Sequence, residues 1–294
     1  WDEVHKLAFS IAYKAVAVNV SDLAAMGAKP HSILLALALP ERLAHKQWLT
    51  EFSKGLFHAC QLFGVTLIGG DTTRNDTLVL SVSAQGLLAA NIPAVYRSGA
   101  QVGDKIYVSG TLGDANYALQ HPDNAIGKEL AHRLHMPTPR IALGAALAEV
   151  GATAMIDISD GLYQDLGHIC QQSSVGMQIN LEHLPSSKAL ASIDLAERLL
   201  CQLAGGDDYE LAFTLPADID PPINSSNTPV TCIGEVIAPS SKLANRPVSN
   251  TVTAANISKT LLPELWYQGQ RVTVSHPAPF STWPNLTGYQ HFAG

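Results

Sequence analysis

The sequence predicts a folded α/β (α+β) protein. Short apolar runs of strand length alternate along the chain with longer segments whose apolar residues recur at helical spacing. Hydrophobic residues make up 47% of the 294 residues, which is enough for cores in one large or two ordinary domains. Glycine-rich loops that carry acidic residues separate several of these segments, so the chain combines a regular scaffold with polar loops.

Charge and composition argue against several classes of function. The formal net charge is −7 and lysines and arginines do not cluster, so we expect no nucleic-acid-binding surface. The longest apolar run, residues 33–39, is far shorter than the roughly 18 residues that cross a bilayer, so we expect no membrane span. The four cysteines have neither C-x-x-C nor zinc-site spacing, which favours reduced thiols in a cytoplasmic protein.

The first predicted elements are a helix over residues 11–26, a buried strand over 33–39 and an amphipathic helix over 46–62. On the first helix, Asn19 and Asp22 lie three residues apart and therefore share a face. Asp22 either belongs to an exposed polar stripe or is directed at a functional site, and the pattern alone leaves both interpretations open.

A strand over residues 65–68 is expected to end abruptly in the sequence Gly69-Gly70-Asp71-Thr72-Thr73. Two glycines allow the backbone to turn and to approach a ligand, while Asp71 and the threonines offer oxygen ligands. A simple hairpin turn is the alternative, because residues 78–84 alternate as a following strand.

Arg97 lies between that strand and the next one, predicted over residues 105–109. Its planar guanidinium suits a phosphate, although a lone arginine before a loop is more often structural. The glycines after residue 109 are spaced G-x-x-G, which is weak evidence for a dinucleotide site. Helices are expected over residues 126–135 and 140–150.

The central motif of the chain covers residues 154–165. It is expected to form a buried strand that leads into a helix whose first turn is capped by Ser159 or Asp160. Asp157, Asp160 and Asp165 then lie close together, and like charges at this proximity need a cation. We hypothesise that they hold a divalent metal beside a phosphate docked on the helix N-terminus.

The rest of the chain repeats the combination of scaffold and acidic loop. A second Gly-Gly-acidic loop at residues 205–210 leads into a strand. The expected elements are strands over residues 177–181, 211–215 and 230–237, a helix over 194–203 and an exposed connection over 239–256.

The absence of several common motifs excludes some of the reactions in which the acidic loops could take part. The sequence contains no Walker A, H-R-D, D-F-G, G-x-S-x-G or H-E-x-x-H pattern. Scattered aspartates without histidine or cysteine clusters form an all-oxygen ligand set that suits Mg²⁺, which also binds the phosphates of a substrate. Phosphoryl transfer from a nucleotide is therefore the expected reaction.

Five motifs in order resemble thiamine-monophosphate kinase, a family of the aminoimidazole-ribonucleotide-synthetase-like superfamily. The motifs lie at residues 19–28, 69–73, 97–100, 157–162 and 205–211, and a Gly-Tyr-x-His-Phe tail at 288–292 adds to the match. The resemblance implies a two-domain fold with mixed sheets covered by helices. The expected domains are an ATP- and Mg-binding dimerisation domain at residues 1–100, truncated at its start, and a C-terminal α/β domain at 101–294.

The resemblance also implies an activity and a set of site residues. The expected enzyme is a cytoplasmic homodimer that uses ATP and several Mg²⁺ ions to phosphorylate thiamine monophosphate by direct in-line transfer, giving thiamine diphosphate, with no catalytic side chain beyond positioning and metal catalysis. The implied metal ligands are Asp22, Asp71, Asp157 and Asp160. ATP is expected to contact Gly70, Asp71, Arg97 and Ser159, and thiamine monophosphate is expected to contact Asp207 and Tyr289.

Three expectations depart from this pattern. Asp207 stands where many relatives have Glu, and a shorter acid would alter the contact with substrate. Asp165 matches no ligand position, so we expect it to face solvent or to pair with His168. The family normally begins with several dozen more residues that carry further metal ligands, which leaves two alternatives open: another ATP-dependent ligase or synthetase of the superfamily, or an inactive, truncated dimeric scaffold.

Overall fold

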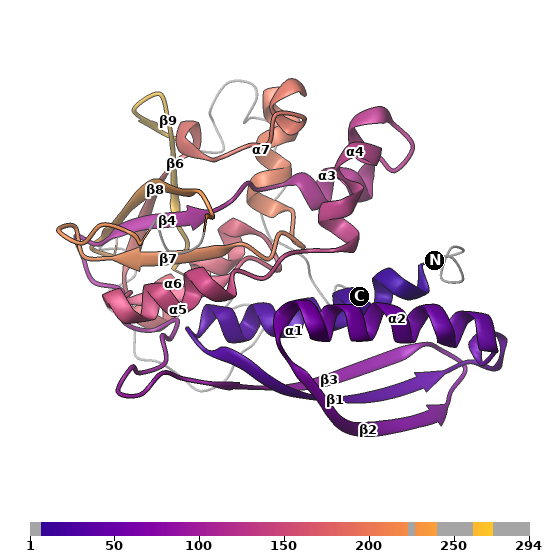
Figure 1. The fold of residues 1–294 in the computed structure, drawn as a ribbon. Helices are drawn as coiled ribbons and strands as arrows, with labels where there is room; N and C mark the ends of the chain where they lie inside the picture. The colour runs from indigo at the N-terminus through magenta and orange to yellow at the C-terminus, as the bar shows by residue number, and fades with distance from the viewer. Residues whose placement is uncertain (1–6, 223–226, 240–260, 273–294) are drawn as a thin grey trace, which may run out of the picture.

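The computed structural model describes residues 7–222, 227–239 and 261–272, which form two β-sheets with helices packed on them (Figure 1). The α-helices are α1 (Ala8–Ala25), α2 (Lys46–Phe63), α3 (Asp114–Gln120), α4 (Ala125–His135), α5 (Ile141–Val150), α6 (Leu162–Ser173) and α7 (Leu195–Ala204). The strands are β1 (Lys29–Leu39), β2 (Thr66–Arg74), β3 (Val79–Leu87), β4 (Lys105–Ser109), β5 (Ala154–Asp157), β6 (Gly176–Asn180), β7 (Leu211–Leu215), β8 (Val230–Ile237), β9 (Glu264–Tyr267) and β10 (Gln270–Arg271). Short 3₁₀ helices are η1 (Glu41–Leu43), η2 (Leu181–His183) and η3 (Leu190–Ser192).

The first sheet has the order β2-β1-β3, with β1 parallel to β2 and antiparallel to β3. Alternation along β1 directs Ile33, Leu35 and Leu37 toward α1 and α2, where they pack with Trp48 and Phe52 in one core. The opposite face of the sheet is exposed. Within the described residues, the first sheet is therefore covered by helices on one face only.

The second sheet has the order β10-β9-β6-β8-β4-β7-β5 and is antiparallel except for the β6/β9 pair. Successive residues of β5 face different cores. Ile156 packs with α6 and α7 residues, whereas Met155 packs with Leu143 and Leu147 of α5. Helices therefore cover both faces of this sheet, and the expectation of mixed sheets covered by helices is confirmed.

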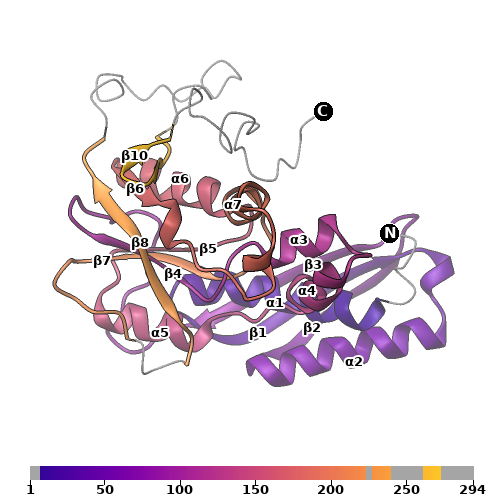
Figure 2. The ribbon, with the colours of Figure 1, turned by 90° about the horizontal axis from the view of Figure 1, so that it is seen from above.

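Helix α1 connects the two parts of the molecule. It packs on α2 and β3 within the first part and contacts α5 and β5 of the second. Both views place the two sheets in different parts of the molecule (Figure 1 and Figure 2). Side chains on α1 can therefore face loops at the ends of the second sheet. Among the described residues, no helix combines the length and the apolar character that a membrane crossing requires.

Most predicted elements are confirmed, and β4, β7 and β8 have the predicted bounds. The prediction that the strand at residues 65–68 ends at Gly69 is wrong, because β2 continues to Arg74. Parallel pairing with β1 carries the strand through the glycines, with Gly70 opposite Leu35. A Cβ at Gly70 would lie 1.9 Å from the Leu35 carbonyl oxygen, so the glycine permits close pairing of the strands.

A buried charge network stands at the start of β7. The Glu210 carboxylate accepts hydrogen bonds from Arg133 (2.8 Å), from Arg140 Nε (2.7 Å) and from the Ser109 hydroxyl (2.6 Å). Burial alone would raise the pKa of Glu210, but the hydrogen bonds and charges of Arg140 and Arg133 outweigh it and lower that pKa. Two arginines from α4 and the start of α5 are thus tied to the sheet through one carboxylate.

We expect Glu210→Ala to lower the free energy of unfolding by about 3–5 kcal/mol, because the two arginines lose their buried partner. The matched control is Glu235→Ala, which removes the half-exposed pair with Lys105 (3.1 Å) and is expected to cost less than about 1 kcal/mol. Urea unfolding of the two variants measures the difference. Equal losses would show that the Glu210 network contributes no more than a surface ion pair.

Candidate active site

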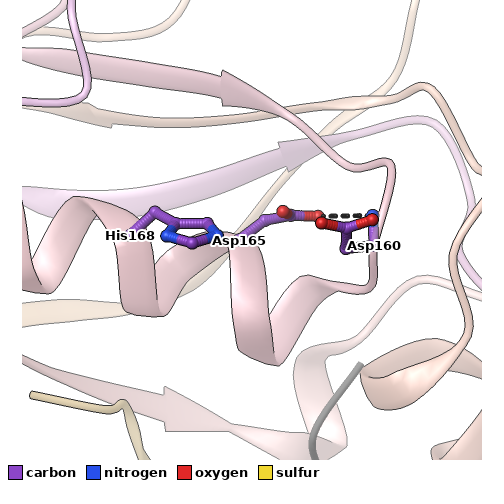
Figure 3. A group of neighbouring side chains, drawn as sticks. All are labelled: Asp160, Asp165 and His168. Atoms are coloured by element: carbon purple, nitrogen blue, oxygen red, sulfur yellow. Dashed lines mark hydrogen bonds between the residues drawn. The ribbon is translucent and has the colours of Figure 1, made fainter. Parts of the chain in front are cut away.

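The segment between β5 and α6 is organised by a side chain that lies further along the helix. Neither Ser159 nor Asp160 caps the helix as predicted, and the N-cap residue is Gly161, which has no side chain to do so. Instead, Asp165 Oδ2 accepts the backbone N–H groups of Ser159, Asp160 and Gly161, each at 3.1 Å. Figure 3 shows the bond to Asp160. Asp165 is only 2% exposed, so the prediction that it faces solvent is wrong.

The acids at the start of α6 form a compact group with His168. Donor atoms of Asp160, Asp165 and His168 all lie within 4.8 Å of one another (Figure 3). Burial, together with the negative charges of Asp160 and Asp157, raises the pKa of Asp165 to about 7, although backbone N–H groups oppose the shift. Asp160 also accepts a hydrogen bond from Gln164 at 3.0 Å. Of the three carboxylates predicted to lie together, Asp160 and Asp165 belong to this compact group, and Asp157 acts on Asp165 through its charge.

The two acidic loops are joined through their backbones. The Asp207 N–H donates to the Ser159 carbonyl (3.0 Å), and the Tyr209 N–H donates to the Ile158 carbonyl (2.9 Å). This approach requires Gly206, because a Cβ there would lie 2.1 Å from the Ser159 carbonyl oxygen. Asp207 and Tyr209 both have positive φ angles, 69° and 51°, so the second loop is held in an uncommon conformation beside the first.

Helix α1 brings Asp22 to the end of β5. Asp157 is 4% exposed, and burial, followed by the negative charge of Asp22, raises its pKa to about 6. Partial loss of hydration also raises the pKa of Asp22, and the charge of Arg97 opposes that shift. Asp22 is exposed on α1, and its charge acts on Asp157, so it lies on a side of the helix that is near the acidic loop. A role for Asp22 in the site stays a prediction.

Arg97 is held beside these acids by α6. The hydroxyl of Ser173, the last residue of α6, donates to the Arg97 carbonyl at 3.1 Å and accepts the N–H of Gly99 at 3.0 Å. The positive charge of Arg97 acts on Asp22, on Asp157 and on His168, whose pKa is lowered by burial and by Arg97. Helix α6 therefore positions acids at its first turn and an arginine at its last.

Sequence reasoning missed a cation on the second acidic loop. The Lys14 ammonium lies 2.8 Å from Asp207 Oδ1 and 5.9 Å from the ring centroid of Tyr209. The Tyr209 hydroxyl also donates to Asp207 Oδ1 at 3.0 Å. The sequence did contain a signal, because Lys14 lies eight residues before Asp22 and helical spacing of seven to eight returns to one face.

Two predicted site residues, Gly70 and Asp71, are not brought into this group. Gly70 and Asp71 lie on β2, in the sheet that is separated from the second part of the molecule by α1 and α2 (Figure 1). Asp71 Oδ1 accepts the N–H of Thr72 at 2.8 Å. Tyr289, with the rest of the tail motif, lies outside the described residues. The group that the structure does assemble comprises Lys14, Asp22, Arg97, Asp157, Ser159, Asp160, Asp165, His168 and Asp207.

This arrangement can bind anions only with additional positive charge. Asp22 on α1 and Asp157 and Asp160 of the β5–α6 segment offer carboxylate oxygens, while the charge of Arg97 acts on Asp22, Asp157 and His168. Oxygen donors of this kind fit Mg²⁺. The chemistry of these donors therefore suits divalent ions, with Arg97 as a nearby cation.

Comparison with known proteins gives consistent results. Residues 1–88 match the family described as AIR synthase related protein, N-terminal domain, and residues 101–217 match the corresponding C-terminal domain. The chain is 43% identical over 237 residues to thiamine-monophosphate kinase of Haemophilus influenzae, covering 77% of this chain and 71% of the relative. It is 42% identical over 240 residues to the enzyme of the same name from Escherichia coli, covering 78% and 72%.

Solved structures are similar over the same region. The crystal structure of thiamine-monophosphate kinase from Stenotrophomonas maltophilia superimposes with a TM-score of 0.73 at 43% identity, covering 79% of this chain and 77% of that chain. A structure described as AaThiL complexed with AMPPCP and TMP has a TM-score of 0.75 at 28% identity and covers 97% and 81%. By sequence and by fold, this chain belongs to the thiamine-monophosphate kinase family of the AIR synthase related proteins.

Proposed function

We propose that this protein transfers the γ-phosphoryl group of ATP to the phosphate of thiamine monophosphate, giving thiamine diphosphate. The observation that carries the proposal is the convergence of Asp22, Asp157 and Asp160 with Arg97 at one junction. Such a site suits a reaction between two phosphorylated substrates. Support also comes from the relatives named for this activity and from the similar structure with AMPPCP, an ATP analogue, and TMP.

Mg²⁺ fits the residues at this junction. Asp22, Asp157 and Asp160 would hold it, and their donors are all carboxylate oxygens. The raised pKa of Asp157 reflects burial and repulsion from Asp22, both of which a divalent ion would relieve. When bound, Mg²⁺ would neutralise charge on the phosphates of both substrates.

The chain's own residues would bind and orient the substrates. Arg97 would contact the phosphates of ATP, and the Ser159 segment, fixed by Asp165, would approach the same nucleotide. Asp207, which is held by Lys14 and Tyr209, would contact thiamine monophosphate together with Tyr289. The acceptor phosphate is already ionised at neutral pH, so positioning can account for catalysis without a general base or a covalent enzyme intermediate.

We also propose a cytoplasmic homodimer that pairs through the first of two domains, at residues 1–100 and 101–294. The exposed face of the first sheet supports this pairing, because it presents Leu34, Ile68 and Val79, of which Ile68 is 57% exposed. Gly70 and Asp71 lie on the same sheet. In such a pair they would be close to the subunit interface, and their roles toward ATP and Mg²⁺ are proposed on the family resemblance.

The direct test is an assay of the purified protein with ATP, Mg²⁺ and thiamine monophosphate, read by chromatographic separation of thiamine phosphates. We expect thiamine diphosphate from the wild type. Asp160→Asn is expected to reduce its formation at least about a hundredfold, because the carboxylate that helps to hold Mg²⁺ is lost.

The matched control is Asp123→Asn, at an exposed position between α3 and α4, which is expected to leave the rate unchanged. Absence of thiamine diphosphate from folded wild type would contradict the proposed function. If ATP were then consumed only with a different acceptor, the activity of another ATP-dependent synthetase would replace the proposed kinase activity. Near wild-type turnover by Asp160→Asn would remove Asp160 from the site.

In the metal-free protein, the ionisation of Asp157 should make the stability of the fold depend on pH. Its pKa rises from about 3.9 in an unfolded chain to about 6 in the fold. Protonated Asp157 therefore gives the folded protein a stabilisation that is fully present below about pH 4. This stabilisation is lost as the pH rises through about 6. Without Mg²⁺, we expect Asp157→Asn to raise Tm over wild type by roughly 5 °C at pH 8 and by little at pH 4.

Thermal unfolding in a chelator measures this difference, with Asp123→Asn as the control that changes Tm at neither pH. Saturating Mg²⁺ is expected to reverse the advantage at pH 8, because the variant lacks a ligand. The same Tm difference at both pH values would show that the charge of Asp157 does not act in the folded protein.

A further inference from the structure

Asp165 accepts three backbone hydrogen bonds from the segment that carries Ser159 and Asp160, yet no role in substrate or metal binding has been assigned to it above. One oxygen, Oδ2, accepts three consecutive N–H groups, those of Ser159, Asp160 and Gly161, at 3.1 Å each. Its own N–H donates to the Gly161 carbonyl at 3.0 Å. Side chain and backbone of Asp165 thus close the first turn of α6 onto the segment before it.

The location of the three amides makes this bond set more than a helix cap. Two of the amides belong to Ser159 and Asp160, and the third belongs to the next residue, Gly161. Fixing these amides therefore fixes the backbone from which the Ser159 and Asp160 side chains project. Without Asp165, three buried or half-buried N–H groups would lose their acceptor, and the segment would lose its defined conformation.

The Asp207 loop has independent supports. Its link to this segment is the bond from the Asp207 N–H to the Ser159 carbonyl, but Lys14 and Tyr209 also hold the Asp207 carboxylate. Loss of Asp165 should therefore displace the Ser159 and Asp160 side more than the Asp207 side. A specific effect on Asp160 would therefore leave the Asp207 loop in place, whereas a general loss of structure would disturb both loops.

We propose that Asp165 is a positioning residue that fixes Ser159 and Asp160 for the phosphoryl transfer. The expected effects on the kinetics rest on the proposed function. The expected effect on the conformation of residues 159–161 does not. It assigns Asp165 an acceptor role that an amide oxygen of the same length can fill. A metal-ligand role for Asp165 would instead require the carboxylate itself.

The test compares Asp165→Ala, Asp165→Asn and Asp194→Ala in the full chain. Asp194 is the matched control, because its carboxylate accepts the N–H groups of Ala196 (2.8 Å) and Glu197 (3.3 Å) at the start of α7. The readouts are kcat, KM for thiamine monophosphate and the Mg²⁺ concentration for half-maximal rate. A further readout that needs neither substrate nor metal is amide hydrogen exchange of residues 159–161 by NMR.

We expect Asp165→Ala to speed exchange of these amides at least about tenfold, and to lower kcat about 10- to 100-fold. Its half-maximal Mg²⁺ concentration should rise, while KM for thiamine monophosphate changes less than about threefold. Asp165→Asn is expected to restore slow exchange and most of kcat, because it keeps an acceptor oxygen. Asp194→Ala should leave all four readouts at wild-type values.

Several results would overturn the inference. Unchanged amide exchange in Asp165→Ala would show that the three bonds do not fix the segment. Slow exchange in Asp165→Asn combined with an alanine-like kcat would assign Asp165 to metal binding instead. If Asp165→Ala does not fold, the asparagine variant decides through the same two readouts. A wild type without activity would contradict the proposed function, while the exchange data would still test the bonds.

Discussion

Mutual repulsion among carboxylates confined to one junction is the constraint around which this structure is arranged. Asp157 is buried at the end of β5, where the charge of Asp22 on α1 acts on it, and Asp160 and Asp165 follow just before and within the start of α6. Burial makes the negative charges of Asp157 and Asp165 costly, and the charges of Asp22 and Asp160 add repulsion. Backbone N–H groups and Arg97 offset part of this cost. A bound divalent ion would offset the remainder, which links the stability of the site to its function.

The scaffold keeps these charges together through contacts that lie outside the acidic group. Glu210 ties Arg133 and Arg140 to the start of β7, and its backbone carbonyl accepts the N–H of Ile158 at 2.8 Å. The same short stretch thus anchors the core and the acidic segment. Helix α6 completes the support, with Asp165 at its first turn and Ser173 at its end. Loops that carry function are therefore held by buried polar bonds on a rigid sheet.

Most of the scaffold could be predicted from the sequence, because apolar spacing records which face of an element is buried. The bounds of β4, β7 and β8 follow from short apolar runs between turn residues. The strand β2 was mispredicted for a tertiary reason. Gly69 and Gly70 favour a turn locally, but pairing with β1 extends the strand through them.

The site was predicted in part. The fold brings the charges of Asp22, Arg97 and Asp157 into mutual influence, and Asp160 acts on Asp165 and His168, while the binding roles of these residues stay predictions. Helical spacing places Lys14 on the same side of α1 as Asp22, but it does not identify Asp207, which lies far along the chain, as the partner of Lys14. Asp165 was misjudged because helical spacing does not reveal a side chain that folds back onto the amides before its own helix.

The central claim is that this acidic junction binds the phosphates of ATP through divalent metal ions. Calorimetric titration of the wild-type protein with AMPPCP, in saturating Mg²⁺ and again in excess chelator, tests that claim most directly. We expect saturable binding with Mg²⁺ and none in the chelator, because the carboxylates alone repel the triphosphate. Equally tight binding under both conditions would contradict the account and would place the nucleotide on cationic side chains alone.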